Sequence, residues 1–215
     1  LLARARDGIA RLRKLDMSKY NLHRSDAPLP PAGYVLVIDQ TFGDASIQHS
    51  GADAAHFHEM LTAAKLEHPK ARIIIKTHPE TARGLRKGHF TAADTDSRST
   101  LLADAVSPWA LLEGATAVYT VSSQLGFEAI LAGHRPRVFG QPFYIGWGLT
   151  DDAFPLPRRN RSLTRTQLFA AAMILTPIWY LPCRDRLCSF EEAVEQLEAE
   201  LRSFREDRDG HVATA

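Results

Sequence analysis

The chain has 215 residues, 45% of them hydrophobic, which is enough to bury the core of one domain or one and a half. Its 26 basic and 25 acidic residues leave a net charge of +1, which excludes a global electrostatic attraction for nucleic acid. No run of 18 apolar residues occurs, which argues against a membrane-spanning helix, and two cysteines five positions apart support neither a disulfide framework nor a four-ligand zinc site.

The pattern of residues 1–25 predicts an amphipathic helix with a basic face. We expect this face to be exposed to solvent and not bound to acidic lipid headgroups. The apolar positions of the helix are Leu2, Ile9, Leu12 and Leu15. Three prolines in residues 26–33 predict a rigid extended linker, which we take as a domain boundary. Because the chain starts without Met and without an apolar signal-peptide core, we expect it to be part of a longer polypeptide.

Residues 34–160 alternate short apolar runs with helical segments. Expected strands cover 34–38, 72–76, 117–119 and 137–139, with another short one near 89–91. Such runs are typical of strands buried on both faces, and short connections through helices favour parallel pairing. The predicted fold class is therefore α/β, a Rossmann-like, mainly parallel sheet with flanking helices.

Residues 161–204 predict carboxyl-terminal helices that follow this sheet domain. The expected helices cover 162–175 and 189–204, and the second has alanine and leucine recurring at four-residue spacing among glutamates. The polar tail at 205–215 is expected to be flexible.

Polar residues follow four of the expected strands, at the edge where parallel sheets bind ligands. The segments are 39–46, 76–80, 120–128 and 141–152. Each has an ordinary explanation by itself, because aspartates close turns, serines cap helices and a histidine can lie on the surface. Their coincidence at four successive strand ends favours one shared ligand site.

The residue types in these segments suit a nucleotide sugar. Ser122 and Ser123 at a helix start, together with His78 held by Pro79, offer donors to a phosphodiester. Glu128, one turn into its helix, is placed to accept from a ribose diol.

Charged residues suggest partners for the sugar itself. Asp44, held in a tight turn, is a candidate to attack or assist at an anomeric carbon. Lys76, or the arginines at 158, 159 and 161, suits a sugar carboxylate or phosphate, although a solvated loop explains the arginines equally well.

Other chemistries are less well supported. Gly-x-Gly-x-x-Gly after a strand, a Walker loop and Gly-x-Ser-x-Gly are all absent, which disfavours dinucleotide, ATP and hydrolase functions. His56 and His58 diverge on a helix, so a metal pair there is not expected.

Four longer motifs resemble the capsular polysaccharide biosynthesis and export proteins of the KpsC type. They are DQTFGDAS at 39–46, KTHPE at 76–80, YTVSSQLGFEA at 119–129 and FGQPFYIGWGLTD at 139–151, followed by Arg-Arg at 158–159. The resemblance covers about residues 34–200, and the last motif is long and unusual.

This resemblance implies a retaining β-Kdo glycosyltransferase of GT-B architecture, of which this chain is chiefly the donor-binding half. The implied substrates are a CMP-Kdo donor and a glycolipid acceptor of the lysophosphatidylglycerol-Kdo type in Gram-negative capsules. It implies that the protein acts together with the capsule export machinery, in the cytoplasm and attached peripherally to the inner membrane face. We expect no metal, no cofactor and no nucleic-acid partner. The alternative is a non-catalytic scaffold module that binds sugar nucleotide or polysaccharide in capsule export.

The resemblance also assigns roles to residues. Asp44 is the expected nucleophile, with Asp39 as second choice, and Glu128 takes the ribose. The resemblance assigns the donor phosphate to His78, Pro79, Ser122 and Ser123. We expect Lys76 and Gln124 to contact the donor phosphate or nucleotide as well. Independently of the resemblance, we expect sugar or acceptor contacts at Gln40, Gln141, Tyr144, Trp147, Arg158 and Arg159.

Overall fold

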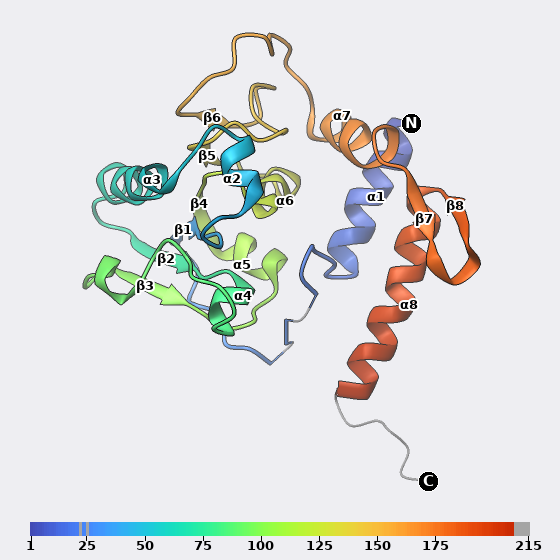
Figure 1. Ribbon diagram of the computed structural model, residues 1–215, viewed down its shortest axis with the longest axis horizontal. Helices are drawn as coiled ribbons and strands as arrows, with labels where there is room; N and C mark the ends of the chain where they lie inside the picture. Colours follow the sequence, from blue (N-terminus) through green and yellow to red (C-terminus); the bar gives the residue numbers. More distant parts are fainter. Residues whose placement is uncertain (22, 25, 209–215) are drawn as a thin grey trace. The chain divides into compact units, whose positions relative to one another are not determined.

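The computed structural model describes residues 1–21, 23–24 and 26–208, and the chain divides into two units. Unit 2 is continuous, from Ser18 to Arg165, and holds the central sheet (Figure 1). Unit 1 joins the first 17 residues to the segment that begins at Thr166.

The sheet of unit 2 has six strands in the order β3-β2-β1-β4-β5-β6, and every neighbouring pair is parallel. The strands are β1 (Tyr34–Ile38), β2 (Arg72–Lys76), β3 (Ser99–Leu102), β4 (Ala115–Thr120), β5 (Arg137–Val138) and β6 (Asp151–Asp152). This confirms the predicted Rossmann-like α/β class. The strand order reverses direction between β1 and β4, and a ligand crevice is expected at such a switch point.

Helices cover both faces of this sheet. They are α2 (Ala45–His49), α3 (Ala54–Glu67), α4 (Pro79–Ala82), the 3-10 turn η1 (Ala92–Asp94), α5 (Pro108–Gly114) and α6 (Gln124–Ala132). Because successive strand residues point to opposite faces, Val35 and Val37 pack in one core cluster with Phe57 of α3, while Leu36 packs in the other with Leu111 of α5. Burying a side chain such as Phe57 stabilises the fold by about 1.5–3 kcal/mol.

Two short elements of the sheet domain differ from expectation. The prediction of a strand near 89–91 is wrong. The structure has an isolated bridge there, between Gly88 and Thr41, and the third strand is β3. Thr100 and Leu101 of β3 are exposed, so this edge strand lacks the apolar run that marks its neighbours.

Unit 1 consists of helices and a two-stranded hairpin. Its elements are α1 (Leu2–Lys14), α7 (Arg165–Phe169, beginning at the last residue of unit 2), the π-helix η2 (Ala170–Leu175), β7 (Trp179–Leu181), the 3-10 turn η3 (Pro182–Arg184), β8 (Arg186–Cys188) and α8 (Phe190–Arg208). Phe190 packs edge-on against Phe169 and Trp179, and a Cβ at Gly8 would lie only 2.8 Å from the Phe190 ring. Arg4 pairs with Glu191 at 2.8 Å.

The division of the chain falls at residues 17/18 and 165/166, whereas the linker was expected at 26–33. The segment after Met17 belongs with unit 2 because Ser18 hydrogen-bonds Glu128 and the Arg24 backbone N–H donates to the Ala105 carbonyl. Of the tail expected at 205–215, residues up to 208 are helical and the rest lie outside the described residues. Within the described part of the chain, no helix combines the length and apolarity needed to cross a bilayer.

Candidate functional site

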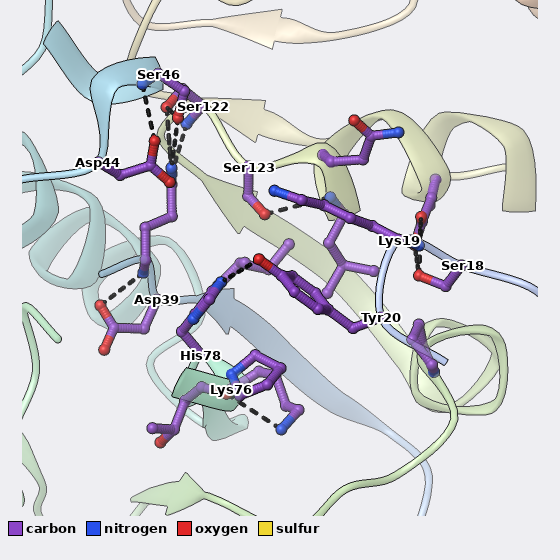
Figure 2. A pocket seen from close by; sticks show the side chains of 18 of the residues that line it. Ser18, Lys19, Tyr20, Asp39, Asp44, Ser46, Lys76, His78, Ser122 and Ser123 are labelled. Atoms are coloured by element: carbon purple, nitrogen blue, oxygen red, sulfur yellow. Dashed lines mark hydrogen bonds between the residues drawn. The ribbon is translucent and has the colours of Figure 1, made fainter. Parts of the chain in front are cut away.

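A cavity of about 640 Å³ lies in unit 2 at the carboxyl ends of β1, β2 and β4. This is the switch point of the strand order, so the position agrees with the rule for ligand crevices of open α/β sheets. Its wall comes from segments 18–20, 38–50, 76–83, 103–108, 122–128 and 141–143, together with His23. Figure 2 shows side chains from several of these segments converging on one space.

Gln40 joins the end of β1 to the end of β4. Its side-chain oxygen accepts from the backbone N–H of Ser122 at 2.9 Å, while Nε2 donates to Ser122 Oγ at 3.1 Å and to Ser46 Oγ at 3.2 Å. A carboxamide carries donors and an acceptor together, so one side chain can satisfy a backbone amide and two hydroxyls. Gln40 is buried, and its two N–H donors are already engaged, which suits a role in holding the hydroxyls in place.

Three helices begin at the cavity, each with a capping side chain. Asp44 caps α2 through the Ser46 amide at 2.8 Å, His78 caps α4 through the Glu80 amide at 3.2 Å, and Ser123 caps α6 through the Leu125 amide at 3.2 Å. Asp44 and Ser123 therefore cap helices, which is the ordinary explanation that the sequence offered for them, and His78 is a capping residue as well. They also direct the partial positive charge of helix starts toward the cavity, where it favours anions.

His78 presents one ring nitrogen to the cavity. Nδ1 accepts a hydrogen bond from the backbone N–H of Glu80, so the neutral ring carries its proton on Nε2. Burial lowers the pKa of His78, which favours this neutral form. Nε2 lies 3.2 Å from the hydroxyl of Tyr20, whose ring meets the imidazole edge-on (Figure 2).

Glu128 lies buried in α6 at another part of the wall. The Ser18 hydroxyl lies 2.8 and 2.9 Å from its two oxygens, and the Lys19 backbone N–H donates at 3.3 Å. Burial raises the pKa of Glu128 to about 7, and these donors oppose the rise. A carboxylate of this kind is a good acceptor for a pair of ligand hydroxyls.

The two candidate nucleophiles have different surroundings. Asp39 is buried, and its Oδ1 accepts from the backbone N–H groups of Gln40 at 2.8 Å and His89 at 3.0 Å. Its Oδ2 finds no partner among the described residues, and a Cβ at Gly88 would overlap that atom. Burial raises the pKa of Asp39 to about 6. Asp39 thus ties β1 to the 88–89 loop, whereas Asp44 is only half-buried and uses one oxygen on the Ser46 amide.

Lys76 lines the cavity but directs its ammonium to backbone carbonyls. Nζ donates to the carbonyl oxygens of Thr77, Leu102 and Asp104 at 3.2, 3.3 and 3.0 Å. An ammonium has three donors, so contact with a ligand phosphate would require breaking one of these bonds. Burial lowers the pKa of Lys76 to about 8.

The loop that follows β5 contributes fewer of the predicted contacts. Gln141 lines the cavity, whereas Tyr144, Trp147, Arg158 and Arg159 are not part of its wall. Tyr144 is buried and donates its hydroxyl to the Ser123 carbonyl at 2.8 Å, which supports the start of α6. Arg159 Nη1 donates to the carbonyls of Pro142, Phe143 and Ile145, and its guanidinium lies over the Trp147 ring at 5.2 Å.

The cavity thus brings together most of the predicted donor-site residues. These are Asp39, Gln40, Asp44, Lys76, His78, Pro79, Ser122, Ser123, Gln124, Glu128 and Gln141. The sequence prediction missed Ser18, Lys19, Tyr20, Ser46, His49 and Arg83, which also line the wall. Ser46 lies inside a motif that was noticed, but residues 18–20 were assigned to the first helix and carried no signal of a site. The described residues contain no cluster of three or more His, Cys, Asp or Glu side chains that could hold a metal.

The fold and the cavity define an α/β protein with a crevice at the switch point of its parallel sheet. Comparisons with known proteins identify its family. The chain belongs to the family of capsule polysaccharide biosynthesis proteins, which matches residues 5–176. It is 41% identical over 186 residues to the capsule polysaccharide modification protein LipA of Neisseria meningitidis serogroup B. It is 37% identical over 205 residues to the lipopolysaccharide-processing protein LpsZ of Rhizobium meliloti.

A solved structure is also similar to this chain. The β-Kdo 2,4 transferase of KpsC from Thermosulfurimonas dismutans is 36% identical and superposes with a TM-score of 0.85 over 92% of this chain and 62% of that one. The alignments include 80% and 93% of this chain but only 26% of LipA and 46% of LpsZ. The chain therefore spans about a quarter to a half of the curated relatives.

Proposed function

We propose that the whole protein is a Kdo transferase of capsule polysaccharide synthesis and that this chain is chiefly its CMP-Kdo-binding half. The observation that carries the proposal is the convergence of His78, Ser122, Ser123 and Glu128 on one cavity at the strand switch. The similarity to the KpsC β-Kdo 2,4 transferase supports the choice of sugar.

The donor would lie with its phosphate near the helix starts. His78 Nε2–H, the hydroxyls of Ser122 and Ser123, and the backbone N–H of Gln124, which opens α6, are donors for phosphate oxygens. Glu128, at another point of the same wall, would accept from the ribose hydroxyls. An apolar part of the wall at Ala103, Ala105, Val106 and Pro108 has the character needed by a flat base.

The chemical step in this proposal retains the anomeric configuration. The Asp44 carboxylate attacks the anomeric carbon, the bond from that carbon to the CMP phosphate oxygen breaks, and CMP leaves as an anion. The acceptor hydroxyl then attacks the anomeric carbon of the glycosyl-aspartate, the bond from that carbon to the Asp44 oxygen breaks and restores the carboxylate, and the hydroxyl proton passes to solvent. The acceptor is a capsule glycolipid, and its binding site is assigned to the part of the protein outside this chain.

Calorimetric titration with CMP tests the donor site. His78→Asn keeps the cap on α4, because asparagine accepts the same backbone amide, but removes Nε2–H from the phosphate. We expect about tenfold weaker CMP binding, the effect of one hydrogen bond to a charged group.

His58→Asn on α3 is the matched control, because its side chain is 64% exposed and is not part of the cavity wall. Undiminished binding by the His78 variant would refute the phosphate role. Binding of CMP without Kdo transfer by the full-length protein would favour a scaffold that holds sugar nucleotide in capsule export.

A further inference from the structure

Residues Ser18–Asn21, here called the strap, lie along the cavity wall and contact two of the groups that the proposed function assigns to the donor. Figure 2 shows Ser18, Lys19 and Tyr20 on the same side of the cavity, with Tyr20 reaching His78. The Ser18 hydroxyl meets Glu128 of α6, and the Tyr20 hydroxyl meets His78 at the start of α4. One short segment therefore supplies a hydroxyl to each of two distant elements.

The strap is locally ordered by its own last residue. The Asn21 side chain accepts from the Ser18 backbone N–H at 2.8 Å and donates to the Ser18 carbonyl at 2.8 Å. A carboxamide that bonds both backbone groups of a residue three positions earlier closes a tight turn. The Lys19 ammonium lies 5.1 Å from the centre of the Tyr20 ring. Hydrogen bonds within the strap therefore hold its turn independently of its contacts with the cavity wall.

The hydrogen bond at His78 cannot coexist with a ligand on the same atom. Nδ1 already accepts from the Glu80 amide at 3.2 Å, so the ring has a single N–H, on Nε2. That N–H points to Tyr20 Oη at 3.2 Å. One N–H makes one good hydrogen bond, so a phosphate oxygen and the tyrosine hydroxyl compete for it.

The contact at Glu128 has a similar consequence. The Ser18 hydroxyl is within 2.9 Å of both carboxylate oxygens, which is the bidentate position that a vicinal diol would take. Its single proton is shared between two acceptors, so two ligand hydroxyls would satisfy the buried carboxylate better. The strap therefore occupies, with weaker partners, the places of a phosphate oxygen and a sugar hydroxyl.

We propose that the strap is an internal competitor of the nucleotide, so that donor binding must release Tyr20 from His78 and Ser18 from Glu128. This inference rests on the proposed function, because it needs a ligand that contacts both groups. If the strap competes with the nucleotide, the Tyr20 hydroxyl lowers the affinity for the donor. An ordinary contact in the cavity wall would raise that affinity.

Titration of the chain with CMP tests the sign of this effect. Tyr20→Phe keeps the ring but removes the competing hydroxyl, and we expect it to bind CMP about fivefold more tightly than wild type, as expected for the loss of one competing hydrogen bond. Tyr180→Phe is the matched control, because Tyr180 also loses a hydrogen bond, to Asp185, but is not part of the cavity wall. Its affinity for CMP should not change.

The possible results separate the two proposals. Tighter binding by Tyr20→Phe supports competition, and so does binding by the variant where wild type binds too weakly to detect. Equal or weaker binding by Tyr20→Phe overturns the strap as a competitor while leaving the donor site in place. Failure of both proteins to bind CMP overturns the donor site and the strap together.

Hydrogen exchange gives a second readout that does not depend on a variant. The Lys19 amide donates to Glu128 in the free protein, so release of the strap should speed its exchange when CMP is added. The Gln124 amide at the start of α6 should exchange more slowly in the same sample because it binds the ligand. Slower exchange at both places would mean that the strap closes over the nucleotide, which contradicts competition.

Discussion

The strand-end segments at 39–46, 76–80 and 120–128 and the loop at 144–161 both contain polar residues, but the two regions use them differently. In the cavity wall, His78 Nε2 and the Glu128 carboxylate have side-chain hydroxyls as partners, from Tyr20 and Ser18 respectively. In the loop, the guanidinium of Arg159 is engaged by three backbone carbonyls. A polar residue within a motif can therefore bind a ligand or shape the backbone, and its remaining donors and acceptors decide which.

The largest effect that this comparison predicts is at Asp44. Asp44→Asn keeps the cap on α2, because asparagine caps as well as aspartate, but removes the nucleophilic charge. We expect Kdo transfer by the full-length protein to fall by at least about 10³-fold with an unchanged melting temperature.

Asp53→Asn is the matched control, because Asp53 caps α3 in the same way and is not part of the cavity wall. Transfer by the Asp53 variant should match wild type. Transfer by Asp44→Asn at the wild-type rate would exclude Asp44 as the nucleophile and direct attention to Asp39.

A smaller effect is expected in the pH dependence of stability. The pKa of Glu128 is raised to about 7, above its value in the unfolded chain, so the folded state holds this proton more tightly. Stability is then lost as the pH rises from about 4.5 to about 7, by about 3 kcal/mol at most. Asp39, with its pKa raised to about 6, acts in the same direction.

Denaturant unfolding at pH 5 and pH 8 measures this term. Glu128→Gln should lose less stability than wild type between the two pH values, because the amide does not ionise. Glu59→Gln, on the exposed side of α3, should behave as wild type. An identical pH profile for Glu128→Gln and wild type would mean that the buried carboxyl does not titrate in this range.

The smallest effect concerns the paired arginines of the loop. Arg159→Ala removes donors from the carbonyls of Pro142, Phe143 and Ile145, and should lower the free energy of unfolding by about 2 kcal/mol. Arg158 is exposed, so Arg158→Ala should change that free energy by less than about 0.5 kcal/mol.

Kdo transfer by the full-length protein then decides between structure and contact. If Arg158→Ala is stable but transfers Kdo poorly, Arg158 is a sugar or acceptor contact, as the sequence analysis predicts. If neither arginine affects transfer once stability is accounted for, the pair serves the loop alone.

Much of the fold follows from local sequence, and so does the location of the candidate site at the carboxyl ends of the strands. The apolar run at 34–38 and the run at 72–76 became adjacent strands because unbroken branched side chains suit a strand buried on both faces. His78-Pro79 and Ser122-Ser123 start helices, as capping chemistry predicts. Because these signals involve residues close together in sequence, they can be read without knowing the fold.

The tertiary structure decided which of these polar groups remain available. Gln40 is engaged by Ser122, 82 positions away, and Glu128 by Ser18, 110 positions away. Periodicity and capping say nothing about such pairs, because each depends on strand order and on where a linker folds back. The sequence by itself determined the edge at which chemistry is possible, and the packing of distant segments decided which side chains at that edge can meet a ligand.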